Sequence, residues 1–363
     1  GRRPRQRIAN LEQQLQFETA LCEKQVSFLK AALEELHSGS GVPVPPAGQG
    51  CGSRIDENFM PSRPPRSVRM PFSDGEFEVG VDKDQNFWVD AATGRWEPET
   101  FKVLNQHVYS GSNYLGLGEL TGVLGLVAAQ RADKAVLVEP DHASVHITWD
   151  NVNRNKRLYP WAQSITVETR CVLDEDDRVM YFMGCDLGGS TVMPRVPWST
   201  ASEWYPVMCM SLPTITAEHS LSPSKPLLIK IDIEGGEAIL LPSLREWVSS
   251  VEVKPTIFVS MHSQSDGWQK EAIANVLNQY PYYAIIRGPK LDTDASVIGD
   301  AVNGLCEKGV LLRRNGGSRF NWENICETCD YLVTTNATGS EALCAEEYAR
   351  TGIPLPTAGK SEL

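Results

Sequence analysis

The sequence contains no long apolar run and no excess of basic residues. None of its apolar stretches approaches the roughly 18 to 20 residues that a helix needs to cross a bilayer. Its 34 Lys and Arg residues are outnumbered by 46 Asp and Glu residues, and the formal net charge is −12. Nucleic acid is bound largely through basic residues that neutralise phosphates, so we expect no nucleic-acid partner. The chain begins with Gly1 rather than Met, which leaves a membrane anchor upstream of these residues open.

The composition is otherwise that of an ordinary globular protein, with 41% hydrophobic and 22% charged residues in a chain of 363. We expect three segments. Residues 1–37 form a stem helix, and residues 38–68 form a linker in which Gly, Ser and repeated Pro exclude a helix. Residues 69–363 form one large folded domain.

The stem carries a heptad pattern. Five apolar residues recur every seven positions: Ile8, Leu15, Cys22, Leu29 and Leu36. This spacing predicts a coiled coil over residues 8–37 through which the chain forms a homo-oligomer. A single helix packed on its own domain is the alternative.

The folded domain alternates short apolar runs with helical stretches. Alternating apolar residues from Phe77 to Val89 predict a strand or hairpin, and a helix follows at 98–106. Four pairs of strand and helix come next: 113–117 with 121–131, 135–139 with 143–155, 227–232 with 237–248, and 256–261 with 267–280. This alternation predicts an α/β, doubly wound fold with a parallel sheet. Residues 173–225 break the rhythm, and we expect an inserted hairpin with long loops near the ligand.

The first strand-to-helix turn is rich in glycine. It contains Gly116, Gly118 and Gly122 and leads directly into a helix. Glycines in such a turn let a ligand approach the backbone closely. The alternative is that they are needed only because a tight turn requires positive φ. Glu139 ends the next strand, 21 residues after Gly118, where an acid accepts both hydroxyls of a ribose. Its alternative role is to cap the following helix, although Asp141 is nearer to that position.

Acidic residues also gather at the end of the buried strand expected at 227–232. Asp232 stands at its carboxyl end, and Glu234 and Glu237 lie in the turn after it. Ligands of open α/β sheets bind outside these strand ends, and ionisable groups are costly to bury unless they are paired or used. The alternative is a salt bridge of Lys230 with acids that cap the next helix.

Three stretches together resemble the successive motifs of the FkbM family of S-adenosylmethionine-dependent O-methyltransferases. They are Gly118–Gly122, Val138–Pro140 followed by Asn151–Asn155, and Lys230–Glu237. The lead-in Trp96–Phe101 and the stretch Pro255–His262 also resemble parts of some members. The likeness spans about residues 94–290, the expected core of the domain. Its most specific part is the Lys-x-Asp-x-Glu-Gly-x-Glu segment.

The resemblance implies a class I methyltransferase fold. In that fold a seven-stranded sheet carries an antiparallel last strand, which we expect at 331–335. Carried over by position, Gly118 and Gly122 would line the methionine part of S-adenosylmethionine. Glu139 would bind the ribose, and Asp232 would face the methyl-transfer site.

One position departs from the family pattern. Where the family usually has an acid two residues before the first glycine, this chain has Gly116. The usual anchor for the amino group of the cofactor is therefore missing at this position. Either Glu119 substitutes for it or the cofactor binds weakly.

Methyl transfer to a hydroxyl requires an oxygen nucleophile in line with the sulfonium, and a general base assists it. Asp232 and His262 end what should be adjacent strands, and with Glu234 they are the candidate catalytic residues. If the three converge, they could hold a hard divalent ion that lowers the pKa of a hydroxyl, but the spacing does not require one. A purely structural role for His262 is the alternative.

The nine cysteines are more than a cytosolic enzyme needs. We expect most of the eight other than Cys22 to be paired. Cys326 and Cys329 lie in polar sequence and are expected in structural disulfides, with Cys306 or Cys344 as partners. Buried reduced thiols would be sufficient to explain the three central cysteines: Cys171, Cys185 and Cys209.

Two short signals favour the secretory pathway. Asn336–Thr338 is a sequon for N-glycosylation, and Lys360–Leu363 resembles an ER-retrieval signal. We therefore expect a protein of the ER or Golgi lumen, in full-length form a type II membrane protein.

The expected activity is methylation of a hydroxyl, most plausibly of a carbohydrate. Trp161, Trp198 and Trp204 offer faces on which sugar rings could stack, or they are simply buried. The competing interpretation is a non-catalytic module that recruits partners through its coiled coil and has lost its cofactor, as Gly116 suggests.

Overall fold

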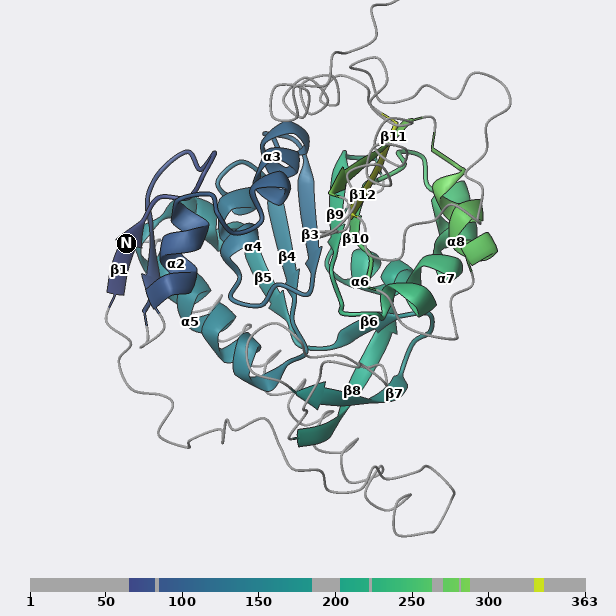
Figure 1. The fold of residues 1–363 in the computed structure, drawn as a ribbon, viewed down its shortest axis with the longest axis horizontal. Coiled ribbons are helices and arrows are strands. Elements are labelled where there is room, and N and C mark those ends of the chain that lie inside the picture. The colour runs from purple at the N-terminus through teal and green to yellow at the C-terminus, as the bar shows by residue number, and fades with distance from the viewer. Residues whose placement is uncertain are drawn as a thin grey trace, which may run out of the picture. The chain divides into compact units, whose positions relative to one another are not determined.

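The computed structural model describes residues 65–81, 85–184, 203–221, 224–262, 270–280, 282–287 and 330–335. These residues form a central sheet with helices on both faces and two smaller sheets beside it (Figure 1). No helix within these ranges is long and apolar enough to cross a membrane. The predicted coiled coil of residues 8–37 lies outside the described residues.

Seven strands form the central sheet. Their order is β5, β4, β3, β9, β10, β12, β11. Their bounds are β3 Asn113–Leu117, β4 Lys134–Val138, β5 Ile165–Glu168, β9 Leu227–Ile231, β10 Thr256–Ser260, β11 Tyr282–Arg287 and β12 Asp330–Thr334. β12 is antiparallel to both of its neighbours, and every other neighbouring pair is parallel. This arrangement is the class I methyltransferase fold, so the predicted fold class and its antiparallel last strand are confirmed.

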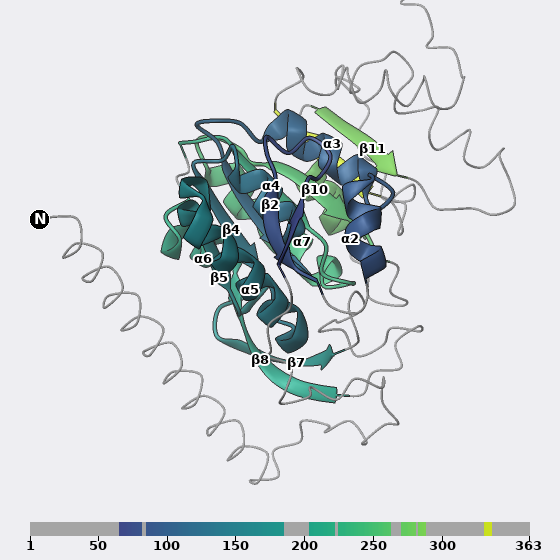
Figure 2. The same ribbon diagram turned by 90° about the vertical axis from the view of Figure 1, so that its left-hand side faces the viewer.

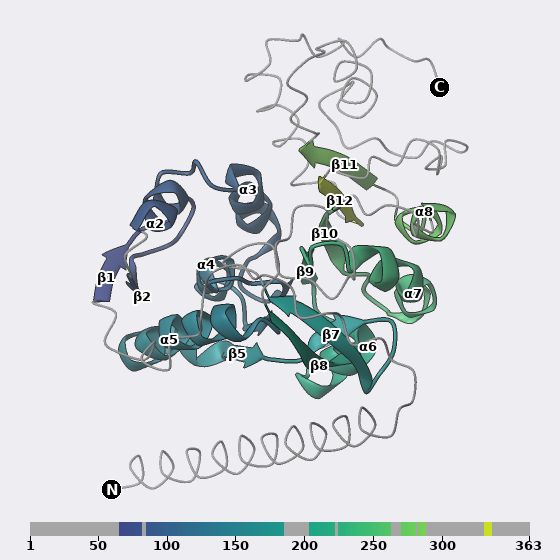
Figure 3. The same ribbon diagram turned by 60° about the horizontal axis from the view of Figure 1, so that its bottom comes forward.

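Helices cover both faces of this sheet because its central strands are apolar on both. In β3, Tyr114 packs into one hydrophobic cluster, and Leu115 and Leu117 pack into another on the opposite face. The first cluster includes residues of α2 Gln85–Ala92, α3 Pro98–His107, α4 Val123–Ala129 and α5 His142–Leu158. The second includes residues of α6 Leu212–Glu218, α7 Glu237–Ser250 and α8 Lys270–Leu277. Figure 3 shows α2 and α3 on one side and α7 and α8 on the other.

An N-terminal ribbon packs against α5. It consists of β1 Pro65–Val68 and β2 Phe77–Gly80, and β1 begins inside the segment that we expected to be linker. Asn151 Oδ1 accepts a hydrogen bond from the Gly80 N–H at 2.9 Å, and Asn155 Oδ1 accepts one from the Glu78 N–H at 2.9 Å. These two Asn side chains of the motif that follows Glu139 therefore anchor the backbone of β2.

The predicted strand or hairpin from Phe77 to Val89 is wrong in its second part. Among the described residues of this range, 77–80 form a strand, and Phe87 and Val89 lie in α2. Trp88 and Ala91, three residues apart, are buried, whereas Val89 is 37% exposed. The burial thus follows the helical period of 3.6 residues rather than the strand period of two.

The inserted region contains the predicted hairpin. β7 Arg178–Gly184 and β8 Glu203–Ser211 pair antiparallel, and β6 Cys171–Leu173 pairs parallel to the other side of β8. This sheet lies at one end of the central sheet (Figure 2).

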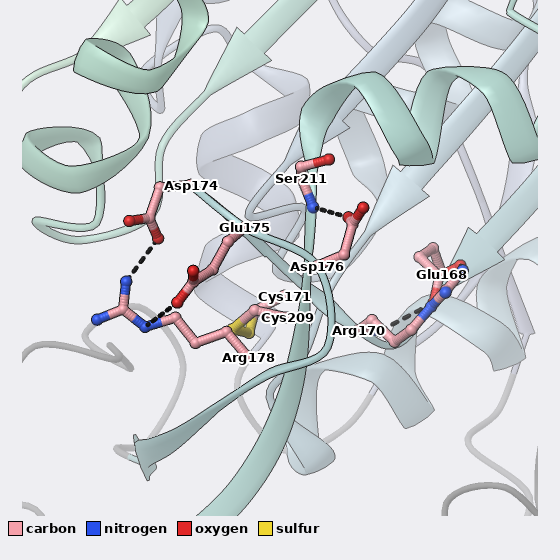
Figure 4. Close-up of a disulfide and its surroundings, with 9 residues drawn as sticks. All are labelled: Glu168, Arg170, Cys171, Asp174, Glu175, Asp176, Arg178, Cys209 and Ser211. Atoms are coloured by element: carbon pink, nitrogen blue, oxygen red, sulfur yellow. Dashed lines mark hydrogen bonds and ion pairs between the residues drawn. A yellow bond between two sulfur atoms is a disulfide. The ribbon is translucent and has the colours of Figure 1, made fainter.

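A disulfide joins Cys171 of β6 to Cys209 of β8, directly opposite each other in the strand register (Figure 4). The alternative that these two cysteines are buried, reduced thiols is therefore wrong. Cys185 lies outside the described residues.

A buried charge cluster ties the end of β5 to α6. Glu168 accepts hydrogen bonds from the Arg170 guanidinium at 2.7 and 2.9 Å (Figure 4). His219 Nε2 lies 3.0 Å from Glu168 Oε2. Arg170 also contacts Glu218 at 2.5 Å. Burial alone would raise the pKa of Glu168, but the hydrogen bonds from His219 and Arg170 outweigh burial and lower it to about 2. The carboxylate therefore stays charged in the folded protein.

Candidate functional site

A cavity of about 200 Å³ opens at the carboxyl ends of β3, β4 and β9. Its ionisable lining residues are six acids and one lysine: Glu97, Glu119, Glu139, Asp141, Lys230, Asp232 and Glu234. The apolar part of its wall includes Leu124, Val138, Val172, Leu173 and Phe182. It therefore occupies the edge at which open α/β sheets bind ligands, with a polar side and an apolar side.

The backbone conformation of the turn after β3, and the lack of space around it, require glycine at two positions. Gly118 has φ +79°, and a Cβ atom on it would lie 1.8 Å from the carbonyl oxygen of Asp232. Gly122 has φ +74°, and a Cβ atom there would lie 2.9 Å from Cγ2 of Thr148. The tight turn with positive φ thus explains both glycines, and the close approach of a cofactor to them stays a prediction.

Glu119 fills the space that a side chain on Gly116 would occupy. A Cβ atom on Gly116 would lie 1.6 Å from Oε1 of Glu119. The Tyr114 hydroxyl donates to Oε1 of Glu119 at 2.7 Å, and the Gly125 N–H donates to Oε2 at 3.0 Å. Burial raises the pKa of this carboxyl. The chain therefore keeps a carboxylate beside position 116, but supplies it from position 119.

Glu139 lies under the glycine turn. Its Oε2 accepts a hydrogen bond from the Leu120 N–H at 2.7 Å, and its Oε1 accepts one from the Asp141 N–H at 2.9 Å. Burial raises the pKa of Glu139 to about 8, and the charges of Asp141 and Glu119 add to this effect. Asp141 caps α5 by accepting from the Ser144 N–H at 2.8 Å, so the helix-capping alternative for Glu139 is wrong.

Lys230 and Asp232 form an ion pair at the end of β9. The Lys230 Nζ atom lies 2.7 Å from Oδ2 of Asp232, and the lysine is 2% exposed. Burial alone would lower the pKa of Lys230, but the charges of Asp232, Glu97 and Glu119 raise it above its ordinary value. Lys230 thus forms a salt bridge, as the alternative expected, but with Asp232 rather than with an acid that caps α7, whose N-cap is Gly236. The ion pair lies in the cavity wall.

His262 stands among three carboxylates. Its Nε2 lies 3.6 Å from Oδ1 of Asp232 and 3.6 Å from Oε2 of Glu234, and its Nδ1 lies 3.3 Å from Oε1 of Glu237. Burial alone would lower the pKa of His262, but the hydrogen bond with Glu237 and the surrounding charges raise it to about 10. Burial raises the pKa of Glu234 to about 7. In this arrangement Glu234 is the better proton acceptor near neutral pH, and His262 is a cation.

Some residues that line the cavity were not predicted from the sequence. Glu97 precedes α3 with a left-handed φ of 44°, and Trp96 lines the cavity beside it. Their only signal was the Trp96–Phe101 lead-in, which we used for the family resemblance and not for the site. Phe182 reaches the cavity from β7 of the hairpin that we expected near the ligand, but no local pattern in the sequence singles out this residue.

Trp161 does not belong to this site. It lies in the 3-10 helix Pro160–Ser164, which leads into the first residue of β5 and so stands at the amino ends of the parallel strands. The cavity is at their carboxyl ends, so Trp161 cannot stack a sugar ring there.

Several other predicted features lie outside the described residues. They are Trp198, the Cys326–Cys329 pair with Cys306 and Cys344, the sequon at Asn336 and the C-terminal tetrapeptide. The side chain of Trp204 is likewise not described.

Comparison with known proteins finds resemblance in structure alone. No family model and no curated protein matches the sequence. A crystal structure of the FkbM methyltransferase of Methylobacillus flagellatus matches 64% of this chain at 16% identity with a TM-score of 0.35, and the match spans 47% of that protein. The S-adenosylmethionine-dependent O-methyltransferase of Thermotoga maritima matches 66% of each chain at 9% identity with a TM-score of 0.30. The S-adenosylmethionine-dependent methyltransferase of Agrobacterium tumefaciens matches 75% of this chain and 70% of its own at 12% identity, with a TM-score of 0.33.

Proposed function

We propose that the protein is an S-adenosylmethionine-dependent O-methyltransferase. The observation that carries this proposal is the buried carboxylate of Glu139, at the end of β4 and directly under the glycine turn that ends β3. A carboxylate at this place in a doubly wound sheet is suited to accept the two ribose hydroxyls of a nucleoside.

The cavity residues fit the cofactor. Glu139 would accept hydrogen bonds from the ribose, and Glu119 would pair with the amino group of the methionine part in place of the acid missing at Gly116. Val172, Leu173 and Phe182 supply an apolar wall for the adenine ring. When bound, the cofactor supplies a sulfonium methyl group, which is the electrophile for a hydroxyl oxygen.

The acceptor side of the site follows from the ionisable residues at the end of β9. Asp232 is fixed by Lys230, and Glu234 lies beside it in the cavity wall. We propose that Glu234 takes the proton of the acceptor hydroxyl and that Asp232 orients the hydroxyl. Carboxylates along the wall accept hydrogen bonds from hydroxyl groups, which supports a carbohydrate or other polyhydroxyl acceptor.

Calorimetric titration of the full chain with S-adenosylhomocysteine tests the cofactor. We expect binding to wild type and at least tenfold weaker binding to Glu139→Gln, because the amide nitrogen cannot accept a hydrogen bond from a ribose hydroxyl. Glu246→Gln is the matched control, since Glu246 is exposed on α7. No binding to wild type, or equal binding by both variants, would contradict the proposal.

A non-catalytic partner-recruiting module is the second candidate, and the absence of an acid at Gly116 motivates it. Under this candidate, wild type gives no calorimetric signal with S-adenosylhomocysteine, and the carboxylate of Glu119 serves only the hydrogen bonds with Tyr114 and Gly125.

We also propose that the protein resides in the lumen of the ER or Golgi and forms oligomers through residues 8–37. The disulfide between Cys171 and Cys209 supports an oxidising compartment. Sedimentation of the full chain and of a Leu15→Asp, Leu29→Asp variant tests the oligomer. If both sediment as monomers, the coiled coil is not an oligomerisation element.

A further inference from the structure

We propose that Asp232, Glu234 and His262 form a binding site for one first-row divalent cation, of which Mn²⁺ and Zn²⁺ suit the donors best. One ligand atom from each residue converges, and all three atoms lie within 4.8 Å of one another. An imidazole nitrogen with two carboxylate oxygens is a mixed donor set that suits these ions.

The spacing of the donor atoms fits a cation. Nε2 of His262 lies 3.6 Å from Oδ1 of Asp232 and 3.6 Å from Oε2 of Glu234. Metal bonds of about 2.0 to 2.2 Å place neighbouring tetrahedral donors roughly 3.3 to 3.6 Å apart. The atoms are too far apart for strong direct hydrogen bonds and need only small shifts to coordinate a common ion.

Glu237 supplies independent support because it orients the imidazole. It is fully buried, and its two oxygens accept hydrogen bonds from the Ile233 and Gly235 N–H groups at 2.7 Å each. Its Oε1 lies 3.3 Å from Nδ1 of His262. A bound metal would displace the proton that Nε2 carries in the metal-free site, because a histidine ligand must be neutral. Glu237 then accepts the Nδ1 proton and leaves the Nε2 lone pair for the metal, and such a second carboxylate is typical of metal-bound histidine. Nε2 here faces Asp232 and Glu234.

The site is open on one side. Asp232 and Glu234 line the cavity, so the coordination positions not filled by protein face the place where an acceptor would bind. Lys230 engages the other oxygen of Asp232, Oδ2, which fixes the rotation of the carboxylate with Oδ1 towards His262. Three protein ligands with an open position are the pattern of catalytic metal sites. A cation here would lower the pKa of a coordinated hydroxyl, and this role rests on the proposed function whereas cation binding does not.

Titration of the full chain with Mn²⁺ alone, followed by electron paramagnetic resonance of the free ion, tests the site. We expect one ion per chain in wild type and at least tenfold weaker binding in His262→Ala and in Glu234→Gln. Zn²⁺ should displace the bound Mn²⁺. Glu246→Gln should bind as wild type does. Glu237→Gln should weaken binding 10- to 100-fold, the usual effect of losing such a second carboxylate.

Melting temperatures distinguish a variant that has lost the cation site from one that has failed to fold. Excess Mn²⁺ should raise the melting temperature of wild type and of Glu246→Gln by equal amounts, and should raise that of a folded Glu234→Gln by clearly less. No stoichiometric ion in wild type, or equal affinity in His262→Ala, would overturn the proposal. Binding of S-adenosylhomocysteine in the presence of chelator, together with no Mn²⁺ binding, would remove the cation site and leave the proposed function. Mn²⁺ binding without S-adenosylhomocysteine binding would remove the proposed function and leave the cation site.

Discussion

The substitution Gly116→Ala should disturb the protein through a residue three positions away. The new Cβ atom would lie 1.6 Å from Oε1 and 2.6 Å from Cδ of Glu119, and 2.8 Å from the Tyr114 hydroxyl oxygen. Neither the strand backbone nor the buried tyrosine can move easily. The carboxyl group of Glu119 must therefore leave its position.

The size of the effect follows from the hydrogen bonds that this movement breaks. The Tyr114 hydroxyl and the Gly125 N–H both donate to Glu119 in the buried interior. A buried donor left without its acceptor costs about 1 to 3 kcal/mol. Leaving two such donors without an acceptor lowers the free energy of unfolding by about 2 to 6 kcal/mol. This is a large share of the stability of an ordinary domain.

Urea denaturation of the full chain measures this loss, with Gly75→Ala as control, because a Cβ atom on Gly75 meets no atom within 4 Å. We expect the control to stay within about 0.5 kcal/mol of wild type. The double variant Gly116→Ala, Glu119→Ala removes the clash with Glu119, so its loss of free energy of unfolding should be clearly smaller than the sum of the two single losses. The exchange Gly116→Asp, Glu119→Ala should bind S-adenosylhomocysteine better than Glu119→Ala alone. If Gly116→Ala is as stable as the Gly75→Ala control, or if the two losses simply add, our account of Glu119 is wrong.

Three further predictions concern the surroundings of the site. Because its folded pKa of about 2 lies below the ordinary 4.5, Glu168 should contribute about 3 kcal/mol of stability above pH 4.5 that is lost as the pH falls towards 2. Urea denaturation between pH 7 and pH 3 should show about 2 kcal/mol of this loss in wild type and a flatter profile in Glu168→Gln. The disulfide closes a sequence separation of 38 residues, so Cys171→Ala with Cys209→Ala should lower the free energy of unfolding by about 4 kcal/mol. Thiol counting under denaturing, non-reducing conditions should find at most seven free thiols, the nine cysteines less these two, and eight or nine would contradict the pairing. Gly118→Ala should lower the free energy of unfolding by more than about 2 kcal/mol and abolish binding of S-adenosylhomocysteine. The reason is that alanine disfavours the φ of +79° and that its Cβ atom meets the Asp232 carbonyl oxygen. A calorimetric titration like that of wild type would refute this prediction.

The central sheet could be predicted because its strands are short apolar runs that end in turn residues. β3, β4, β9, β10 and β12 each lie within one residue of their expected bounds. The approach of His262 to Asp232 was predictable too, since both follow strands expected to be neighbours, and β9 and β10 do pair in parallel.

The remaining features depend on contacts between distant segments. Phe87 and Val89 alternate as strand residues do, and only the burial of Trp88 and Ala91 against the core shows the helical period. Glu97 and Phe182 reach the cavity through the packing of α3 and β7, which no spacing in the sequence encodes. The sequence left two alternatives for the acid missing at Gly116, substitution by Glu119 or weak cofactor binding, and only the volume that Glu119 occupies places its carboxyl group beside position 116.

The side chain of Asn151 has a consequence for how the protein opens. Its Oδ1 accepts from the Gly80 N–H at 2.9 Å, and its Nδ2 donates to the Thr121 carbonyl oxygen at 2.9 Å. One amide group thus connects the outer ribbon, helix α5 and the glycine turn, and none of the three can separate without breaking a buried hydrogen bond. The ribbon and the turn therefore belong to one cooperative unfolding unit, in which the amide protons of Gly80 and of the turn exchange with solvent in the same opening event.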